Sequence, residues 1–534
     1  MSIKIPPVLL YTIIVSLGGF IFGFDASVIS GTANYLTNEF QLNDIQLGFV
    51  FSAPILGAII ATLSAGILSD YLGRRNLLRV IAFLYLLSAI ASAFAPTYWT
   101  LVIARFMGGL AFCSLMVAPM YIAEISQPEK RGKMVSINQL NIVIGFSAAY
   151  FANFYLLELS QTSNDFVVTL GIDTQTWRWM LGLEIIPALI WFILLFFIPR
   201  SPRWLALKHH DEEAEQVLKE LHGDAKVHSF KNEINEIRAS LSDKDTSLLA
   251  SLKFLFGSKM RFALMVGLIV GVAQQITGIN AVFFYAPSIF EQSGVGTNAA
   301  FAQAILVGLI NVIFTAIAML LIDKLGRKPL LIVGLSGVVL SMALISYGFS
   351  QATYKLSKQD VEQIAEQYPE LADLTDITDV TYTSDVEFKN TLIDTLGHQS
   401  FNQAQGELLK LASNMNATII LLGILGFVAS FAVSLGPVMW VMFSEIFPNH
   451  IRGIAISFVG VINSIVSFTV TLVFPWELSN LGAATTFLIY GVFAGLGLIL
   501  VIKMFPETKG KTLEELESEF TEHSIKTAQK SWQG

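Results

Sequence analysis

Long apolar segments separated by short polar stretches run through almost the whole chain. Segments of about 20 residues match a bilayer core about 30 Å thick, because an α-helix rises 1.5 Å per residue. The pattern predicts an all-α membrane protein with twelve spanning helices, near residues 8–29, 46–69, 78–96, 100–124, 134–156, 178–199, 262–290, 300–322, 329–350, 417–444, 453–475 and 483–503.

Basic side chains gather between alternate pairs of these segments. Lysine and arginine favour the cytoplasmic side of a membrane. We therefore expect a multi-pass protein of the cell (inner) membrane with both termini in the cytoplasm and the polar stretch 351–415 outside. The basic clusters lie at residues 74–79, 130–133, 200–208, 324–328 and 452.

Short motifs recur between the two parts of the chain. DYLGRR at 70–75 recurs as DKLGRK 253 positions later, and EISQPEKRG at 124–132 recurs as EIFPNHIRG 321 positions later. The two offsets differ by 68, close to the length of the polar insert 351–415, which lies between the copies in the second part only. The sequence thus predicts two related six-helix halves, a recurring transporter design in which one half rocks against the other.

The longest internal connection carries charges of both signs in a helical pattern, as in DEEAEQVLKELH. We expect it to cap the cytoplasmic face between the two halves. The predicted organisation is an N-terminal six-helix half (1–199), this cytoplasmic helical linker (200–261), a C-terminal six-helix half (262–505) that includes the acidic insert, and a cytoplasmic tail (506–534).

Composition agrees with a membrane protein and excludes other classes. Of 534 residues, 54% are hydrophobic and 14% are charged, against roughly 25% charged in a soluble domain. The net charge of −8 comes mostly from the insert, where eleven Asp and Glu stand against four Lys between Tyr354 and Lys410, so it does not indicate a cationic partner. We expect no nucleic-acid partner. The single cysteine, Cys113, excludes an internal disulfide and a cysteine metal cluster.

The spans contain no nucleophile-and-base pair, phosphate loop or metal-spaced cluster. We therefore expect neither an enzyme nor a cofactor nor a bound metal.

The recurring motifs place acidic and basic side chains at the inner ends of the spans. A carboxylate seven residues before an Arg-Gly pair, facing a Gly-Arg turn, can form ion pairs across the two halves when the cytoplasmic side is closed. Such pairs would latch one conformation, although the basic residues are also ordinary anchors at a cytoplasmic surface. The candidates are Asp70, Arg74, Arg75, Glu124, Arg131, Asp323, Arg327, Glu445 and Arg452.

Three full charges lie well inside the predicted spans: Asp25, Arg105 and Glu184. Each lies five or six residues from the outer end of its span, which places all three about 8 to 9 Å below the outer boundary. A lone charge in the bilayer costs at least ~2.5 to 3.5 kcal/mol. We therefore expect the guanidinium and the two carboxylates to face one another and to reduce this cost.

Such a group of charges can be purely structural, yet one arginine against two acids also favours protonation of one acid, since arginine stays charged. All seven histidines lie outside the predicted spans. A proton crossing the bundle would therefore be carried by a carboxylate.

The chain resembles the sugar porter family of the major facilitator superfamily in seven stretches that occur in order: DYLGRR, PMYIAEISQPEKRGKMVSINQL, SPRWL, QQITGINAVFFYAPSIF, DKLGRKPLL, GPVMWVMFSEIFPNHIRG and PETKG. The resemblance covers nearly the whole chain except the acidic insert. It implies the major facilitator fold and a carrier of monosaccharides or polyols that works by alternating access.

Proton-coupled sugar porters resemble this chain in having an acid at the position of Asp25, where passive facilitators commonly have a neutral residue. The resemblance thus implies a proton-coupled symporter for pentoses, hexoses or polyols, similar to those of bacteria. Its expected partners are the sugar, protons and the lipid bilayer, and it is expected to act as a monomer. Protonated Asp25 would release Arg105, which would pair with Glu184 and let the bundle rock inward.

The candidate sugar site combines amides with aromatic rings, because Asn and Gln both donate to and accept from sugar hydroxyls. Gln274 and Gln275 cannot share a regular helix face with Asn280, and Gly278 predicts a break that turns all three inward. The resemblance implies the hydrogen-bonding set Gln139, Gln274, Gln275, Asn280, Asn311 and Asn463. It also implies that Trp440 stacks on the sugar ring and that Phe22, Phe284 and Tyr285 close the outer side.

Two positions depart from the family pattern. Arg200 stands where the family's PESPRWL-like motif has an acid, which puts one cytoplasmic ion pair in question. Ser464 follows Asn463 where many members have a tryptophan, which predicts a roomier site or a different substrate.

Three alternatives stay open: a passive uniporter of the same fold, a sugar sensor that does not transport, and an exporter of unrelated drugs. Asp25 argues against the uniporter. A sensor is expected to have a long signalling tail, and only about 25 residues follow PETKG.

Overall fold

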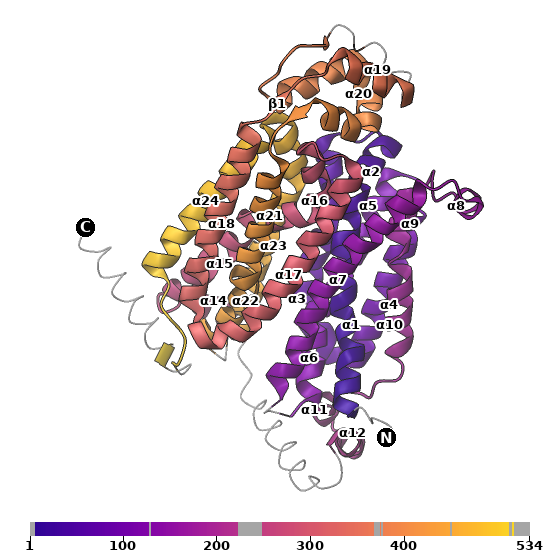
Figure 1. Cartoon of the computed structure of the whole chain (residues 1–534). Coiled ribbons are helices and arrows are strands. Elements are labelled where there is room, and N and C mark those ends of the chain that lie inside the picture. Colours follow the sequence, from indigo (N-terminus) through magenta and orange to yellow (C-terminus); the bar gives the residue numbers. More distant parts are fainter. Residues whose placement is uncertain are drawn as a thin grey trace, which may run out of the picture.

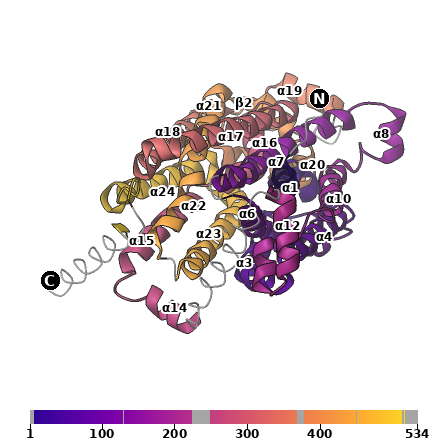
Figure 2. The ribbon, with the colours of Figure 1, turned by 90° about the horizontal axis from the view of Figure 1, so that it is seen from below.

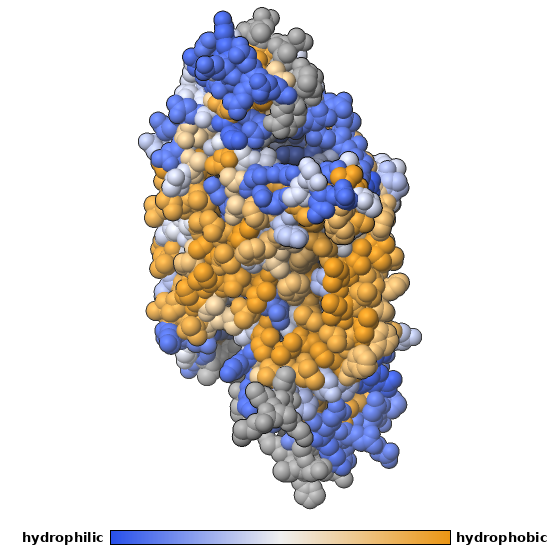
Figure 3. Space-filling model, turned by 45° about the vertical axis from the view of Figure 1, so that its right-hand side comes forward, coloured by the Kyte–Doolittle hydropathy of each residue, from blue (hydrophilic) through white to orange (hydrophobic). Residues whose placement is uncertain are grey.

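The computed structural model describes residues 6–127, 130–222, 248–367, 374, 377–448, 451–511 and 515–516. Within these residues, 12 helical segments are long and apolar enough to cross a membrane, as the hydropathy pattern predicted. On the face that Figure 3 shows, hydrophobic residues form a broad band across the middle, with hydrophilic residues toward both ends. The chain is therefore a multi-pass membrane protein.

The first part of the chain forms one bundle of helices. Its elements are α1 (Pro7–Val28), the 3-10 helix η1 (Ile29–Thr32), α2 (Ala33–Phe40), α3 (Asp44–Leu72), α4 (Arg74–Ala93), α5 (Tyr98–Ala111), α6 (Ser114–Ile125), α7 (Arg131–Ser160), α8 (Asp165–Leu170), α9 (Thr176–Gly182) and α10 (Ile185–Leu194). The connection to the second bundle contains α11 (Pro202–Leu207), α12 (Asp211–His222) and α14 (Leu248–Leu255).

The second bundle lies beside the first (Figures 1 and 2). Helix α3 packs against α23, and α7 packs against α17, along the contact between the two halves. The second bundle comprises α15 (Arg261–Ile276), α16 (Ile279–Gln292), α17 (Thr297–Leu325), α18 (Arg327–Ser350), α21 (Ala417–Val433), α22 (Leu435–Ile446), α23 (Arg452–Asn480) and α24 (Gly482–Met504).

Several of the spans are broken part-way. The breaks fall between α1 and α2, α5 and α6, α9 and α10, α15 and α16, and α21 and α22. The break between α15 and α16 is the one expected at Gly278, whose φ of 83° is the left-handed conformation that glycine adopts freely. Irregular backbone at membrane depth is tolerated where it lines a cavity or is buried in protein, and broken helices often surround a transporter's binding site.

The insert 351–415 folds into a small helical domain rather than an open loop, and we call it the cap. It contains α19 (Lys358–Gln367), α20 (Asp385–Ala412, bent at Gly397), and a short antiparallel pair of strands, β1 (Thr353–Tyr354) and β2 (Ser413–Asn414). It has an apolar core of its own, in which Tyr354 stacks on Phe388. Figure 1 shows it above one end of the bundle, which we call the cap end.

The cap is anchored to the second half. Asp385 accepts a hydrogen bond from the main-chain nitrogen of Ala483 at 3.1 Å, and Lys389 donates to Gln292 at 3.3 Å. Burial lowers the pKa of Lys389, and the nearby carboxylate of Asp385 opposes that shift. The cap also contacts α2 of the first half.

Helix α1 begins and α24 ends at the opposite end of the bundle, which we call the terminal end (Figure 1). There α12 packs against α1, and the hydroxyl of Tyr11 donates to Glu220. Helix α14 contacts α23 of the second half. Residues 223–247 lie outside the described residues, so the expectation that the linker caps the face between the halves stays a prediction.

Candidate functional site

The three intramembrane charges predicted to meet do so inside the first half. Asp25 lies on α1, Arg105 lies on α5, and Glu184 directly precedes α10 at a helix break. Their residues are 0%, 2% and 2% exposed. Arg105 forms an ion pair with the Asp25 carboxylate, and its Nη2 donates to the Asp25 main-chain oxygen at 3.3 Å. Glu184 lies within electrostatic reach of both.

This charged cluster leaves polar atoms unsatisfied. Asp25 Oδ2, Glu184 Oε1 and Arg105 Nε are buried and have no hydrogen-bond partner in the described part of the chain. Two neighbouring carboxylates repel each other unless one of them holds a proton. A single proton on either acid would supply the missing donor, so the site is suited to holding one.

A cluster of amides forms where α15 and α16 meet α23. Asn463 donates to Gln274 at 2.9 Å, Gln275 donates to Asn463 at 3.3 Å, and Asn280 donates to Gln275 at 3.0 Å. The break at Gly278 brings Gln274, Gln275 and Asn280 together, as expected. Each amide can exchange a partner in this cluster for a sugar hydroxyl, because both kinds of group donate and accept.

Sequence reasoning missed one member of this cluster, Ser467, whose hydroxyl accepts a hydrogen bond from Asn280 at 2.5 Å. Ser467 is four residues after Asn463 on α23 and therefore lies on the same helix face. That spacing is the signal that could have identified it.

The remaining candidates for sugar binding lie on other helices. Asn311 is buried on α17 and accepts from Thr315 at 3.5 Å, and Gln139 is half-buried on α7. No hydrogen bond between either of them and the amide cluster is found among the described residues. Trp440 on α22 is 52% exposed, so its ring is not enclosed in this conformation. Phe22 packs edge-on against Phe112.

Aromatic rings pack against one another on α16 and its neighbours, between Asn280 of the amide cluster and the cap. Tyr285 stacks on Phe51 of the first half with ring centres 4.4 Å apart, and its hydroxyl donates to the Thr471 main-chain oxygen at 3.3 Å. Helix α16 departs from helical geometry at Tyr285, two residues before Pro287. Phe284 is buried here as well. We call the stacked pair of Tyr285 and Phe51 the plug, and Phe51 is a member that the sequence did not indicate.

At the terminal end, the ion pairs of the recurring motifs form within each half among the residues that the structure describes. The pairs across the halves expected for a closed cytoplasmic side stay a prediction. Arg74 donates through Nε to Glu124 at 3.0 Å, and Arg327 donates through Nε to Glu445 at 3.1 Å. The reason is local. Each arginine opens a helix next to the preceding span, so its side chain lies beside a carboxylate of its own bundle. In this conformation the motifs brace each half separately.

The aspartates of these motifs are duplicated as well, whereas the remaining arginines bond to main-chain oxygens at positions that differ between the halves. Asp70 pairs with Arg74 at 2.9 Å and Asp323 with Arg327 at 3.3 Å. The Nε atoms of Arg131 and Arg452 donate to main-chain oxygens of Ala123 and Phe447, both at 3.1 Å, and Arg75 Nη1 donates to Ile198 at 3.5 Å.

In each half, a hydroxyl also donates a hydrogen bond to the glutamate that pairs with the arginine. Ser201 donates to Glu124 at 2.5 Å in the first half, and Thr508 donates to Glu445 at 2.6 Å in the second. Glu507, one residue before Thr508, accepts from the main-chain nitrogens of Arg327 and Lys328 at 3.0 and 3.1 Å. The matching residue before Ser201 is Arg200, which pairs with Glu213 at 3.3 Å instead. The departure at Arg200 therefore removes an acidic cap from the start of α4.

A family model described as "Sugar (and other) transporter" matches residues 11–365 and 402–520. The chain belongs to this family. Its members are transporters, so the protein is a membrane transporter and not an enzyme, as expected.

Individual relatives cover almost all of the chain. The arabinose-proton symporter of Bacillus subtilis (strain 168) is 34% identical over 513 residues, which cover 96% of this chain and 94% of that protein. The D-xylose-proton symporter of Escherichia coli (strain K12) is 32% identical over 551 residues, covering 97% and 96%.

Solved structures resemble the fold as well. An inward-open structure of the xylose transporter XylE from E. coli has a TM-score of 0.71 at 30% identity, covering 96% of this chain and 99% of that one. The major facilitator fold predicted from the sequence is thereby confirmed.

Proposed function

We propose that this protein is a proton-coupled symporter that imports a monosaccharide by alternating access. The observation that carries the proposal is the buried cluster of Asp25, Arg105 and Glu184, which holds two acids against one base. The similarity to arabinose-proton and D-xylose-proton symporters supports it. Pentoses, hexoses and polyols are the substrate class, and which of them is carried is a matter for experiment.

The proposal includes the orientation given by the basic clusters. The cap faces outside, the terminal end faces the cytoplasm, and the protein acts as a monomer in the cell (inner) membrane. The functional units are two halves, at 1–199 and 262–505, with the linker 200–261 and the tail 506–534 on the cytoplasmic side.

Proton coupling follows from competition for one guanidinium. While Asp25 is ionised, it pairs with Arg105. When a proton neutralises Asp25, Arg105 gains more by turning toward the Glu184 carboxylate. A membrane potential adds ~2.3 kcal/mol per charge per 100 mV to the inward movement of the proton, so sugar accumulation against a gradient becomes possible.

The amide cluster supplies the proposed sugar site. Gln274, Gln275, Asn280 and Asn463 bind hydroxyls from the second half, while Gln139 and Asn311 complete the set from facing helices and Trp440 stacks on the ring. Each neutral hydrogen bond contributes only ~0.5 to 1.5 kcal/mol. Several hydrogen bonds are therefore needed to bind the sugar, and their summed free energy stays small enough for the sugar to be released.

The two ends of the bundle act as gates in this proposal. The plug, together with Phe22 on α1 and Phe284 on α16, closes the outside. The repeated motifs at the terminal end brace each half as a rigid body, so that the halves move as units. Rigid halves are what rocking around a central site requires.

Uptake into sealed vesicles tests the proposal. A panel of radiolabelled arabinose, xylose, glucose and inositol is supplied with and without an imposed inward proton gradient. The proposal expects at least one sugar to accumulate above its external concentration only when the gradient is present. Equal uptake in both conditions, unchanged by Asp25→Asn, would instead identify a passive uniporter.

A further inference from the structure

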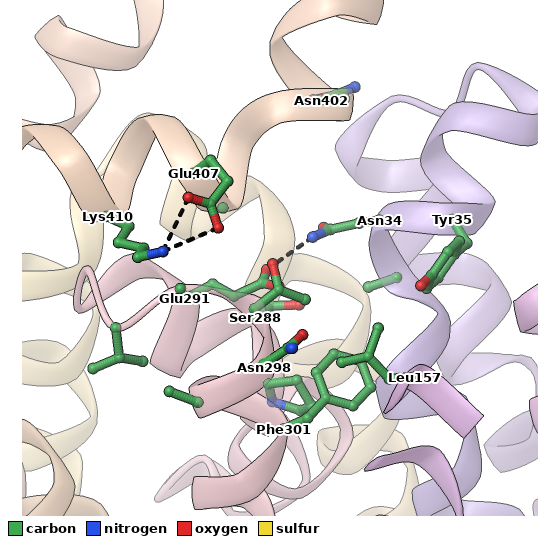
Figure 4. Close-up of a pocket in the computed structure, with 18 of the residues that line it drawn as sticks. Asn34, Tyr35, Leu157, Ser288, Glu291, Asn298, Phe301, Asn402, Glu407 and Lys410 are labelled. Atoms are coloured by element: carbon green, nitrogen blue, oxygen red, sulfur yellow. Dashed lines mark hydrogen bonds and ion pairs between the residues drawn. The ribbon is translucent and has the colours of Figure 1, made fainter. Parts of the chain in front are cut away.

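A cavity of about 660 Å³ lies beneath the cap, beyond the plug. On α16, Glu291 at the cavity comes eleven residues after Asn280 of the amide cluster, which corresponds to about 16 Å along a helix. The cavity is therefore separate from the proposed sugar site, and we call it the vestibule. Its walls come from the first half, the second half and the cap, including Asn34, Asn38, Ser288, Glu291, Asn402 and Glu407 (Figure 4).

The vestibule is lined by buried acceptors that lack donors. Glu291 is 3% exposed, its Oε2 accepts a hydrogen bond from Asn34 at 2.8 Å, and the Thr297 hydroxyl lies close to the same carboxylate. Glu291 Oε1, Asn38 Oδ1 and Ser30 Oγ are buried and have no hydrogen-bond partner among the residues described. Buried polar atoms in native proteins almost always have a partner, so a ligand that donates several hydrogen bonds fits this lining.

The charges of the lining disfavour an anion. Glu291 and Glu407 stand against the single Lys410, which pairs with Glu407 at 3.1 Å. A metal ion is a poor fit, since the described residues hold no group of three or more His, Cys, Asp or Glu able to ligate one. Amides, a hydroxyl and a carboxylate around a space of several hundred Å³ suit a small polyhydroxylated molecule.

We propose that the vestibule is a second sugar site, distinct from the one at the amide cluster. The inference rests on the proposed function for the identity of the solute. Asn34 and Asn38 belong to the first half, whereas Ser288 and Glu291 belong to the second, so the site is complete only while the two halves meet at the cap end. A ligand that binds one conformation better shifts the population toward it. Sugar in the vestibule therefore holds the outer end closed and slows uptake at high external sugar.

Cysteine protection tests occupancy directly. Cys113 is buried and is the chain's single cysteine, so Ser288→Cys provides one reactive thiol in the vestibule. Its rate of labelling by a membrane-impermeant maleimide is measured in the full-length protein in vesicles, with arabinose, xylose or glucose added. We expect about tenfold slower labelling at ten times the apparent dissociation constant.

Three variants separate the vestibule from the central site. Protection should persist with Gln275→Ala, which weakens the amide cluster, and should be lost with Glu291→Leu and reduced with the more conservative Glu291→Gln. Glu362→Gln, an exposed carboxylate on the cap outside the vestibule, is the matched control and should retain protection. Labelling that no sugar slows, or protection that disappears with Gln275→Ala, would overturn the proposal.

Uptake measured in the same vesicles distinguishes failure of the second-site proposal from failure of the proposed symport function. A sugar that is transported but never protects Ser288→Cys contradicts the vestibule alone, whereas failure of every sugar to be transported contradicts the proposed function. Wild-type uptake should pass through a maximum and fall as external sugar rises, and Glu291→Leu should abolish the fall. A simple plateau in the wild type would contradict the closing effect.

Discussion

Arg105 holds Asp25 at two points, the carboxylate through an ion pair and the main-chain oxygen through a hydrogen bond of 3.3 Å. Neutralising the carboxylate weakens the first contact and leaves the second in place. The guanidinium thus stays beside Asp25 while it turns toward Glu184.

Replacing the proton carrier should uncouple transport. With Asp25→Asn, we expect loss of gradient-driven accumulation, because the amide cannot exchange a proton, while exchange of labelled for unlabelled sugar across the membrane continues. Both are measured in vesicles with the sugar found by the uptake panel. Asp173→Asn changes an exposed carboxylate outside the cluster and is the control. Accumulation by Asp25→Asn at the wild-type level would exclude Asp25 as the carrier.

Removing one amide should weaken sugar binding by a limited amount. Gln275 bonds to both Asn280 and Asn463, so Gln275→Ala removes a direct sugar contact and loosens its neighbours. The loss of ~0.5 to 1.5 kcal/mol per hydrogen bond corresponds to about a 2- to 13-fold higher KM for uptake. Gln363→Ala, exposed on the cap, should leave KM unchanged. An unchanged KM in Gln275→Ala would place the sugar elsewhere.

The two halves differ at the equivalent residues Arg200 and Glu507, so substitutions at these two positions should change the stability in opposite directions. Glu507 satisfies two main-chain donors at the start of α18, so Glu507→Ala should lower the unfolding free energy by about 0.5 to 2 kcal/mol. Arg200→Glu should raise it by a similar amount, since it places an acid before α4 and gives up only a partly exposed ion pair with Glu213.

Thermal unfolding of the purified protein in detergent checks both changes, with the exposed Glu366→Ala as the control. A lower Tm for Arg200→Glu would show that the basic residue is itself stabilising at this position.

The spans and the buried charges could be predicted because their physical signals are strong. Twelve apolar stretches leave little choice of architecture, and the high cost of a lone charge in a bilayer requires a partner for Asp25. The break at Gly278 was predictable for a similar reason, since three amides otherwise point in different directions.

Other features depend on tertiary packing that one sequence does not display. The ion pairs within each half depend on how Arg74 and Arg327 fold back onto their own bundle. The helices of the cap were not predicted, because they bury only a narrow apolar stripe, such as Val361 and Ile364 on α19. Phe51 joins the plug from a helix far away in sequence, and nothing in its local pattern distinguishes it from ordinary core phenylalanines.

Proton movement during sugar entry is the most direct measurement of the central claim. Vesicles without an imposed gradient are given the transported sugar while external pH is followed with a dye. The account predicts that sugar addition makes the external medium more alkaline in the wild type and leaves it unchanged with Asp25→Asn. Sugar entry in the wild type without any accompanying change in external pH would contradict it.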